Sequence, residues 1–200
     1  MEEMRCEMIS WVEVQRLCER LAESIRASRY CPDIVIAIGR GGYIPARLVC
    51  DYLGIMELTS IRVEHYLSGS DRQKEVSIRY PLRDDISSLQ VLLVDDVNDS
   101  GDTLDAAVRH LRTYNPREIR AAVMHNKAVS GFSTDYYARK IVKWRWLIYP
   151  WAVNEDISGF LKRLSPAPDS LGDAQKQLAE HFGINVPQQR LRDILALPGR

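Results

Sequence analysis

The sequence lacks a surplus of charge of either sign. Its 27 Lys and Arg residues balance its 27 Asp and Glu residues, so the formal net charge is zero. A neutral chain has no overall electrostatic field that would attract nucleic acid or an anionic membrane surface. We therefore expect no nucleic-acid partner and no membrane partner, and any anion that the protein binds must be held by local geometry.

Long hydrophobic runs and paired cysteine motifs are also missing. No apolar stretch approaches the roughly 20 residues that a membrane span needs, and no apolar signal-peptide run follows the acidic start of the chain. The 4 cysteines form no Cys-x-x-Cys pair and have no histidine at zinc-ligand spacing. They are expected to be free thiols, most of them buried. These absences favour a reduced, cytoplasmic protein.

What is present is a globular composition with alternating strand and helix patterns. Apolar runs at 33–38 and 91–94 predict strands, 118–124 is a further strand candidate, and the periodicity of 43–53 and 103–114 predicts helices. Strands without polar alternation are typical of parallel sheets that helices cover on both faces. The predicted fold class is therefore α/β, with a doubly wound and mainly parallel sheet. Ligands of such sheets bind beyond the carboxyl ends of the strands, where both glycine-containing turns fall.

The segments around this core carry weaker signals. Ser10 and Glu13 form a capping box at the start of a helix with one apolar face. Residues 66–77 are polar and charged, which predicts a long loop and a candidate lid. Two amphipathic helices are expected near 171–182 and 187–197, as a C-terminal helical appendage and not a second full domain.

The strongest chemical signal is the stretch 91–104. A buried strand delivers Asp95 and Asp96 to its end, and residues 100–103 then lead into a helix. Backbone N–H groups of such a turn, its hydroxyls and the helix dipole together form a phosphate cradle. Carboxylates beside the cradle would repel a bare phosphate, whereas they suit sugar hydroxyls or a metal. The stretch therefore predicts a phosphosugar site, with the ribose diol on the two aspartates.

This stretch resembles the signature of the type I phosphoribosyltransferases, which bind 5-phosphoribosyl 1-diphosphate (PRPP). The shared pattern is four apolar residues, two acids, two spacers, an acid, Ser or Thr, Gly, any residue and Thr. The resemblance implies Mg²⁺ as cofactor, with Asp96 as a metal contact made through water. It also implies a small hood beside the sheet. The residues that it assigns to PRPP are Arg40, Gly41, Gly42, Asp95, Asp96, Asn98, Asp99, Ser100, Gly101, Asp102 and Thr103.

A glycine turn, residues 39–42, follows the first core strand. By itself a glycine turn after a strand is a weak signal. In the family that the longer motif resembles, this turn holds the pyrophosphate through backbone amides and one basic residue, and a non-proline cis peptide often occurs there. Arg40 matches the basic residue, and its planar, permanently charged fork suits a diphosphate. Arg40 and Asp99 are therefore the candidate catalytic residues.

Asp99, the third acid of the motif, indicates a branch of the family. Enzymes that act on 6-oxopurines carry Asp at this place, whereas orotate and adenine enzymes usually carry Thr or Ala. A carboxylate here can bond the N7–H tautomer of the base or accept its proton as N9 attacks. The resemblance further assigns Lys127 to the purine O6 and Trp146 to stacking on the base, with Leu147 beside the ring.

Residues 143–146 alternate cation and tryptophan, which predicts a strand with both tryptophans on one face. Interleaved basic and aromatic residues also occur in nucleic-acid sites, and the tryptophans could instead pack in the core or at an edge. Both interpretations stay open beside the stacking role that the resemblance assigns to Trp146. Ala152 stands where bacterial xanthine–guanine enzymes carry an acid, so a second protein-ligated metal would have to use Asp156.

The expected organisation is a phosphoribosyltransferase domain over residues 1–156 and a helical extension over 157–200. The hood would come from the N-terminal region and about 127–156. The predicted lid would close over the activated sugar and exclude water. Its candidate contacts are Tyr66, Arg72 and Lys74. The family resemblance favours a homodimer or homotetramer.

The resulting prediction is a purine phosphoribosyltransferase. It would transfer ribose 5-phosphate from PRPP to N9 of hypoxanthine, guanine or xanthine, as in purine salvage, and release pyrophosphate. One alternative is a transferase of the same fold for adenine, uracil or orotate, against which Asp99, Lys127 and Trp146 argue. The other is a PRPP- or nucleotide-sensing regulator that kept the fold. Residues 157–200 carry six Lys or Arg against four acids, which is too little positive charge to favour DNA binding.

Overall fold

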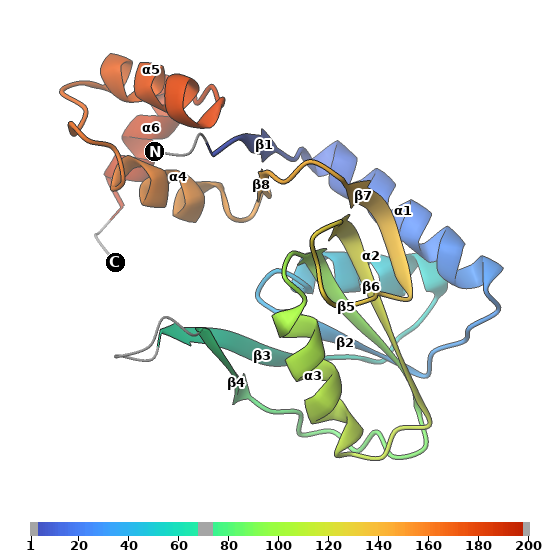
Figure 1. Cartoon of the computed structure of the whole chain (residues 1–200). Coiled ribbons are helices and arrows are strands. Elements are labelled where there is room, and N and C mark those ends of the chain that lie inside the picture. The colour runs from blue at the N-terminus through green and yellow to red at the C-terminus, as the bar shows by residue number, and fades with distance from the viewer. Residues whose placement is uncertain (1–3, 68–73, 198–200) are drawn as a thin grey trace. The chain divides into compact units, whose positions relative to one another are not determined.

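A computed structural model of the chain describes residues 4–67 and 74–197 (Figure 1). The chain divides into two compact units. The first comprises residues 1–13 and 145–200, and the second comprises residues 14–144. Within the described ranges, no helix is both long enough and apolar enough to cross a membrane.

The second unit is built on a mainly parallel sheet. Its six strands lie in the order β4-β3-β2-β5-β6-β7, and β4 alone runs antiparallel to its neighbour. The strands are β2 (Ile34–Gly39), β3 (Leu58–Leu67), β4 (Lys74–Tyr80), β5 (Gln90–Asn98), β6 (Glu118–Lys127) and β7 (Tyr136–Ile141). Because β2 and β5 are parallel neighbours at the centre, the turns that follow them lie at the same edge of the sheet.

Helices cover both faces of this sheet (Figure 1). On one face, α3 (Asp102–Arg112) places Leu104 and Leu111 in a core cluster with Ile36 and Leu93 of the central strands. On the other face lie α2 (Tyr43–Leu53) and α1 (Trp11–Ala27), and the Cys18 thiol of α1 lies 3.6 Å from the Met124 sulfur of β6. The predicted fold class, α/β with a doubly wound and mainly parallel sheet, is confirmed.

The first unit combines two short strands with three helices. β1 (Cys6–Met8) pairs in parallel with β8 (Trp146–Ile148). The helices α4 (Val153–Leu161), α5 (Leu171–Phe182) and α6 (Gln188–Leu195) enclose a separate apolar cluster. The two predicted C-terminal helices are thereby confirmed, whereas α4 was not predicted. Residues 145–156 fall in the same unit as 157–200, and the predicted boundary at 156 stays a prediction.

The structure corrects three local predictions. β5 does not end at Val94 but continues to Asn98, because the acidic residues still pair with β6. Both described ends of the predicted loop 66–77 are strand: β3 extends to Leu67, β4 starts at Lys74, and the two pair from Arg62 onward, while residues 68–73 lie outside the described residues. Residues 143–145 carry no strand, so the two tryptophans of 143–146 do not share one strand face.

The cysteines are free thiols as predicted, but only two of them, and not most, are buried; the predicted cap at the start of α1 agrees with the structure. All 4 cysteines are free, and Cys18 and Cys50 are buried, whereas Cys31 is exposed. Burial raises the pKa of the Cys18 thiol to about 12, so this thiol is inert as a nucleophile at neutral pH. At the start of α1, the Glu13 N–H donates to the Ser10 hydroxyl at 3.2 Å.

Candidate active site

The turn after β2 is a glycine turn at the carboxyl edge of the sheet. β2 ends at Gly39, the Gly39–Arg40 peptide bond is cis, and the Gly42 N–H donates to the Ile38 carbonyl at 2.8 Å. The resemblance had implied a non-proline cis bond at this turn. Arg40 is exposed, so its guanidinium is accessible to a ligand at the turn.

Two of the glycines are needed because other atoms come very close. A Cβ on Gly42 would overlap backbone atoms of Ile38 and Val94, and a Cβ on Gly41 would overlap the carboxylate of Asp96. The first clash is with fixed backbone and the second is with a side chain that can move. The Gly41–Asp96 approach also brings together the two motifs that the sequence had linked only through a family resemblance.

Asp95 and Asp96 lie in the last part of β5. Asp95 is buried, and one of its carboxylate oxygens accepts the Asp96 N–H at 2.9 Å. Burial, and then the charge of Asp96, raise the pKa of the Asp95 carboxyl well above its ordinary range, although the bonded N–H acts in the opposite direction. Asp96 is half-buried and faces the glycine turn, so the pair presents oxygen acceptors next to that turn.

The next turn leads into α3 and has the form of an anion cradle. Gly101, at φ 102°, is the residue before the first turn of α3, so the helix N-terminus opens toward this turn. The Ser100 hydroxyl donates to the Asp102 carboxylate at 2.8 Å, which turns that carboxylate toward its neighbour in the loop. Thr103 is half-buried in the first turn of the helix. The positive end of the α3 dipole and the backbone N–H groups of this turn can together bind a phosphate.

The Asn98 side chain links the end of β5 to neighbouring segments. Its side chain is buried, and its amide donates to Asn126 at 2.7 Å and to the Phe132 carbonyl at 2.9 Å. Its oxygen accepts from the Ser130 hydroxyl at 2.8 Å. The side chain therefore ties the cradle to residues 126–132, and the assignment of Asn98 to PRPP stays a prediction. A backbone bond from Gly131 N–H to the Ser100 carbonyl reinforces this tie.

Asp99, Lys127 and Trp144 form a compact cluster at the ends of β5 and β6. The Lys127 ammonium, whose side chain is only 3 % exposed, donates to one Asp99 oxygen at 2.7 Å. The Trp144 indole N–H donates to the other Asp99 oxygen at 3.1 Å. The same ammonium lies 4.5 Å from the centre of the Trp144 ring. The predicted purine residues Asp99 and Lys127 are thus brought together, one position from the phosphate cradle.

Comparison with known proteins adds a direct test of the family. The model of the phosphoribosyl transferase domain matches residues 10–156. The xanthine phosphoribosyltransferase 1 of Saccharomyces cerevisiae is 31% identical in a comparison of 189 residues, and the match covers 74% of this chain and 90% of that one. The chain belongs to the phosphoribosyltransferase family. The predicted membership is confirmed.

Two solved structures extend the comparison. The purine phosphoribosyltransferase of Pyrococcus horikoshii has a TM-score of 0.66 and 31% identity, covering 74% of this chain and 94% of that one. A protein of Neisseria gonorrhoeae with bound ppGpp has a TM-score of 0.66 and 28% identity, covering 76% and 91%. The described α/β sheet with its two turns is therefore the fold of known phosphoribosyltransferases.

The remaining residues assigned to the purine lie in the first unit. Trp146 belongs to β8, and its ring meets that of Phe160 edge-on at 6.4 Å. Leu147 is buried in the same strand. Sequence reasoning chose Trp146 and missed Trp144, although the alternating pattern of 143–146 contained both. The missing signal was that this segment leaves the strand, which places Trp144 beside Lys127.

Half of the predicted lid, residues 68–73, lies outside the part of the chain that the structure describes. Tyr66 lies in β3 and Lys74 lies in β4, so their backbones belong to paired strands. Arg72 lies outside the described residues. The assignment of these three residues to PRPP stays a prediction.

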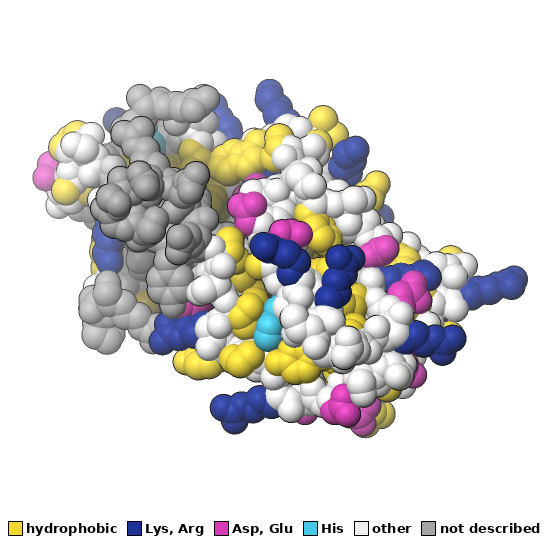
Figure 2. All heavy atoms as spheres, turned by 60° about the horizontal axis from the view of Figure 1, so that its bottom comes forward, with side chains coloured by type: hydrophobic (Ala, Val, Ile, Leu, Met, Phe, Trp, Pro, Cys, Tyr) yellow, Lys and Arg dark blue, Asp and Glu magenta, His cyan; other side chains and the backbone are white. Residues whose placement is uncertain are grey.

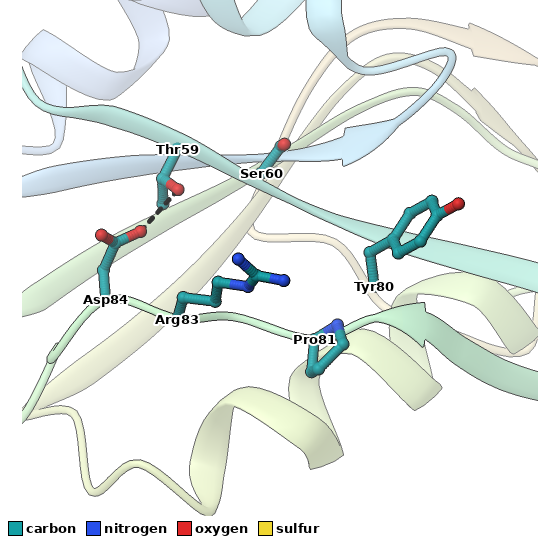
Figure 3. Close-up of a pocket in the computed structure, with 6 residues that line it drawn as sticks. All are labelled: Thr59, Ser60, Tyr80, Pro81, Arg83 and Asp84. Carbon is teal, nitrogen blue, oxygen red and sulfur yellow. Dashed lines mark hydrogen bonds between the residues drawn. The ribbon is translucent and has the colours of Figure 1, made fainter.

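A separate hollow of about 400 Å³ lies beside β3. It is lined by Thr59, Ser60, Tyr80, Pro81, Arg83 and Asp84. Arg83 extends along it, and the Thr59 hydroxyl donates to Asp84 at 2.6 Å (Figure 3). Thr59 and Ser60 pair with the middle of β2, upstream of Gly39, so the hollow lies away from the carboxyl edge. It contains neither glycine turn nor phosphate cradle, and we do not assign the phosphoribosyltransferase site to it.

Proposed function

We propose that this phosphoribosyltransferase transfers ribose 5-phosphate from PRPP to N9 of a 6-oxopurine and releases pyrophosphate. The observation that carries the proposal is the Lys127–Asp99 pair at 2.7 Å, one residue before the phosphate cradle. A 6-oxopurine offers an O6 acceptor and an N7–H donor on one edge. A lysine and an aspartate side by side complement that edge, whereas adenine offers an amino group in place of the oxygen.

The PRPP groups are distributed over the two turns. Arg40 and the amides of Gly41 and Gly42 bind the departing diphosphate, whose negative charge grows as the C1′–O bond breaks. Asp95 and Asp96 accept hydrogen bonds from the ribose hydroxyls. These assignments rest on the closeness of Gly41 to Asp96 and on the family resemblance.

The 5′-phosphate takes the cradle before α3. The groups that bind it are the backbone amides of 98–103 with the hydroxyls of Ser100 and Thr103, at a helix N-terminus. Because the transition state is close to an oxocarbenium ion, the protein needs no nucleophile of its own. Holding both substrates in line and stabilising the leaving group supply most of the acceleration.

The base is held and deprotonated by the cluster at β5 and β6. Asp99 accepts the N7 proton while N9 attacks, and Lys127 donates to O6 and so disfavours bases without an oxygen there. Trp146 and Leu147 belong to the other unit, and their assignment to the base rests on the family resemblance alone. Closure of the 66–77 region over the site, with Tyr66, Arg72 and Lys74 as contacts, is part of the same proposal.

Mg²⁺ fits this site as a metal shared with the substrate. The described residues contain no group of three or more metal ligands, so no closed protein cage exists in that part of the chain. Mg²⁺ usually keeps several waters and takes one or two carboxylates together with substrate phosphates, which matches Asp96 beside the diphosphate turn. When bound, it supplies positive charge to the leaving diphosphate. Asp96 would hold the ion through water. Asp156, the acid that a second protein-ligated metal would have to use, belongs to the first unit.

The test is pyrophosphate release with PRPP and Mg²⁺, measured separately with guanine, hypoxanthine, xanthine, adenine, uracil and orotate. Turnover confined to 6-oxopurines is expected. Turnover confined to adenine or a pyrimidine would leave the family membership intact and refute the proposed role of Asp99 and Lys127 in binding a 6-oxopurine. The molecular mass in solution, measured by light scattering, would test the proposed homodimer or homotetramer. The cytoplasmic location stays a prediction.

One observation favours a second candidate, a nucleotide-binding regulator. The Neisseria protein, 28% identical, was solved with bound ppGpp. A guanine nucleotide with a diphosphate would offer this chain the same purine edge and the same anionic group that PRPP and base offer together. Binding of ppGpp without turnover of any base would support the regulator. Binding of ppGpp that competes with PRPP in an active enzyme would support the transferase.

A further inference from the structure

In the cluster of Asp99, Lys127 and Trp144, each side chain contacts the other two. Each carboxylate oxygen of Asp99 has its own donor, Lys127 at 2.7 Å and Trp144 at 3.1 Å. The ammonium in turn lies over the indole ring, 4.5 Å from its centre. The two groups that should read the purine are therefore already bonded to a third side chain of the same unit.

Packing does not explain the position of Trp144. Its side chain is 43% exposed, and its segment, 142–145, contains no helix or strand. An indole placed only for burial would lie deeper, as most tryptophans in proteins are largely buried. The polar contacts, not apolar burial, hold it against Asp99 and Lys127.

The indole offers the same two groups as the edge of a 6-oxopurine. Its N–H is a donor for a carboxylate, as the N7–H of the base would be. Its electron-rich face attracts an ammonium, as the O6 oxygen of the base would. Asp99 and Lys127 cannot satisfy the indole and the base with the same atoms at the same time.

We propose that Trp144 is an internal competitor for the purine site, and that the base binds only after the indole has left Asp99 and Lys127. The inference rests on the proposed function, because it takes Asp99 and Lys127 as the base-reading pair. The apparent affinity for the base is then the intrinsic affinity multiplied by the fraction of molecules in which the indole is displaced. The ion pair of Lys127 and Asp99 survives displacement, so the buried ammonium keeps a counter-charge until the base arrives.

The first test is Trp144→Phe, which keeps a ring over Lys127 and removes the N–H, with Trp144→Ala as the variant that also removes the ring. Loss of one charge-assisted hydrogen bond should lower the KM for guanine or hypoxanthine by roughly threefold to tenfold, with the KM for PRPP unchanged. Trp11→Phe, an exposed tryptophan of the other unit, is the matched control and should change neither constant. An unchanged or increased KM for the base would overturn the proposal, and an increase would make Trp144 a stacking platform.

A second measurement reads the contact without activity. The chain has 4 tryptophans, and Trp144→Phe identifies the indole N–H resonance of Trp144 in a nitrogen-15 spectrum. Asp99→Asn should move that resonance, and saturating guanine should move it further toward the position of a solvent-exposed indole. A resonance indifferent to both changes would overturn the proposal. If no base is turned over or bound, the proposed function fails and the competition fails with it; if bases are turned over but the resonance stays fixed, the competition alone fails.

Discussion

At the scale of single residues, Lys127 and Asp99 depend on each other. A buried ammonium is costly unless an anion compensates it, and Lys127 is almost fully buried while Asp99 is partly exposed. The pair therefore has an inner cation, which is fixed, and an outer carboxylate, which a ligand can reach. This asymmetry suits a site in which the carboxylate handles a proton and the cation holds an oxygen.

Replacing Asp99 by Asn should separate proton transfer from binding. The amide keeps the shape but cannot accept the N7 proton, so we expect kcat for the preferred base to fall roughly 100-fold with little change in the KM for PRPP. The free energy of unfolding should fall by about 1–2 kcal/mol, since Lys127 loses its counter-charge. Steady-state kinetics and urea unfolding check both effects. Asp105→Asn, an exposed carboxylate paired with Arg109 at 3.1 Å, is the control, and an equal loss in that variant would contradict the account.

The neighbouring glycines should fail for different reasons. A Cβ on Gly42 meets backbone that cannot move aside, so Gly42→Ala should cost about 1–3 kcal/mol of stability. A Cβ on Gly41 meets only the Asp96 side chain, so Gly41→Ala should fold nearly normally but bind PRPP at least about tenfold more weakly. Urea unfolding and PRPP titration distinguish them. Gly159→Ala, which meets open space in α4, should be neutral or slightly stabilising.

At the scale of elements, the Asn98 side chain holds the phosphate cradle before α3 in place. Asn98 connects the end of β5 to Asn126 of β6 and to residues 130–132, so one side chain fixes the relative position of three segments. A buried polar network of this kind is costly to break, because each partner loses its bond inside the protein.

Asn98→Ala should therefore destabilise the protein and loosen the phosphate site together. We expect a loss of about 1–3 kcal/mol in the free energy of unfolding, and a KM for PRPP that rises while the KM for the base stays near the original value. Chemical unfolding and kinetics with each substrate varied in turn measure this. A variant with intact stability and intact PRPP binding would show that the network is not what positions the cradle.

In the first unit, the Asp156 carboxyl of α4 has a raised pKa. Burial raises the pKa of Asp156 to about 6. The folded state therefore favours the protonated form, and the ionised form destabilises the protein increasingly as the pH rises from about 4 through about 6. Asp156→Asn should be more stable than the original by about 1 kcal/mol at neutral pH and equally stable near pH 4. The expected gain is small because the Asp156 carboxyl is partly exposed to solvent, which screens its charge. Thermal unfolding across this range tests it, with the exposed Asp169→Asn as control; an equal gain at both pH values would contradict the assignment.

Much of this element pattern follows from the sequence. The apolar runs of β2 and β5 and the periodicity of α2 and α3 predicted the parallel sheet, because burial on both faces leaves a clear signature. The extent of β3 and β4 was missed, since their polar outer ends resemble a loop. Short α4 was missed because its sequence lacks a helix-capping residue before Val153: its first preceding residue is Ala152, with no side-chain cap.

At the scale of the whole molecule, recognition of anions is local. Positive and negative side chains are interspersed on the face shown in Figure 2, in keeping with a net charge of zero. A chain with no net charge has no overall steering field, so we propose that the affinity for PRPP comes from the backbone amides, Arg40 and the end of α3. We expect PRPP binding to depend less on salt than in proteins with a strongly basic surface.

The candidate site was predictable to the extent that one continuous motif carries it. Residues 95–103 and the glycine turn were found because adjacent parallel strands bring their following turns together. Trp144 and the partners of Asn98 were not found, because they reach the site from distant segments whose course is set by tertiary packing. The grouping of 145–156 with the C-terminal helices was likewise invisible in the local pattern.

The most direct test of the central claim is the ratio of kcat/KM for hypoxanthine to that for adenine, with PRPP and Mg²⁺. These bases differ at the edge that Asp99 and Lys127 are proposed to read. A site built around hydrogen bonds to one edge rejects the wrong base strongly, so a ratio of about 10⁴ in favour of hypoxanthine is expected. A ratio near one, or a preference for adenine, would contradict it.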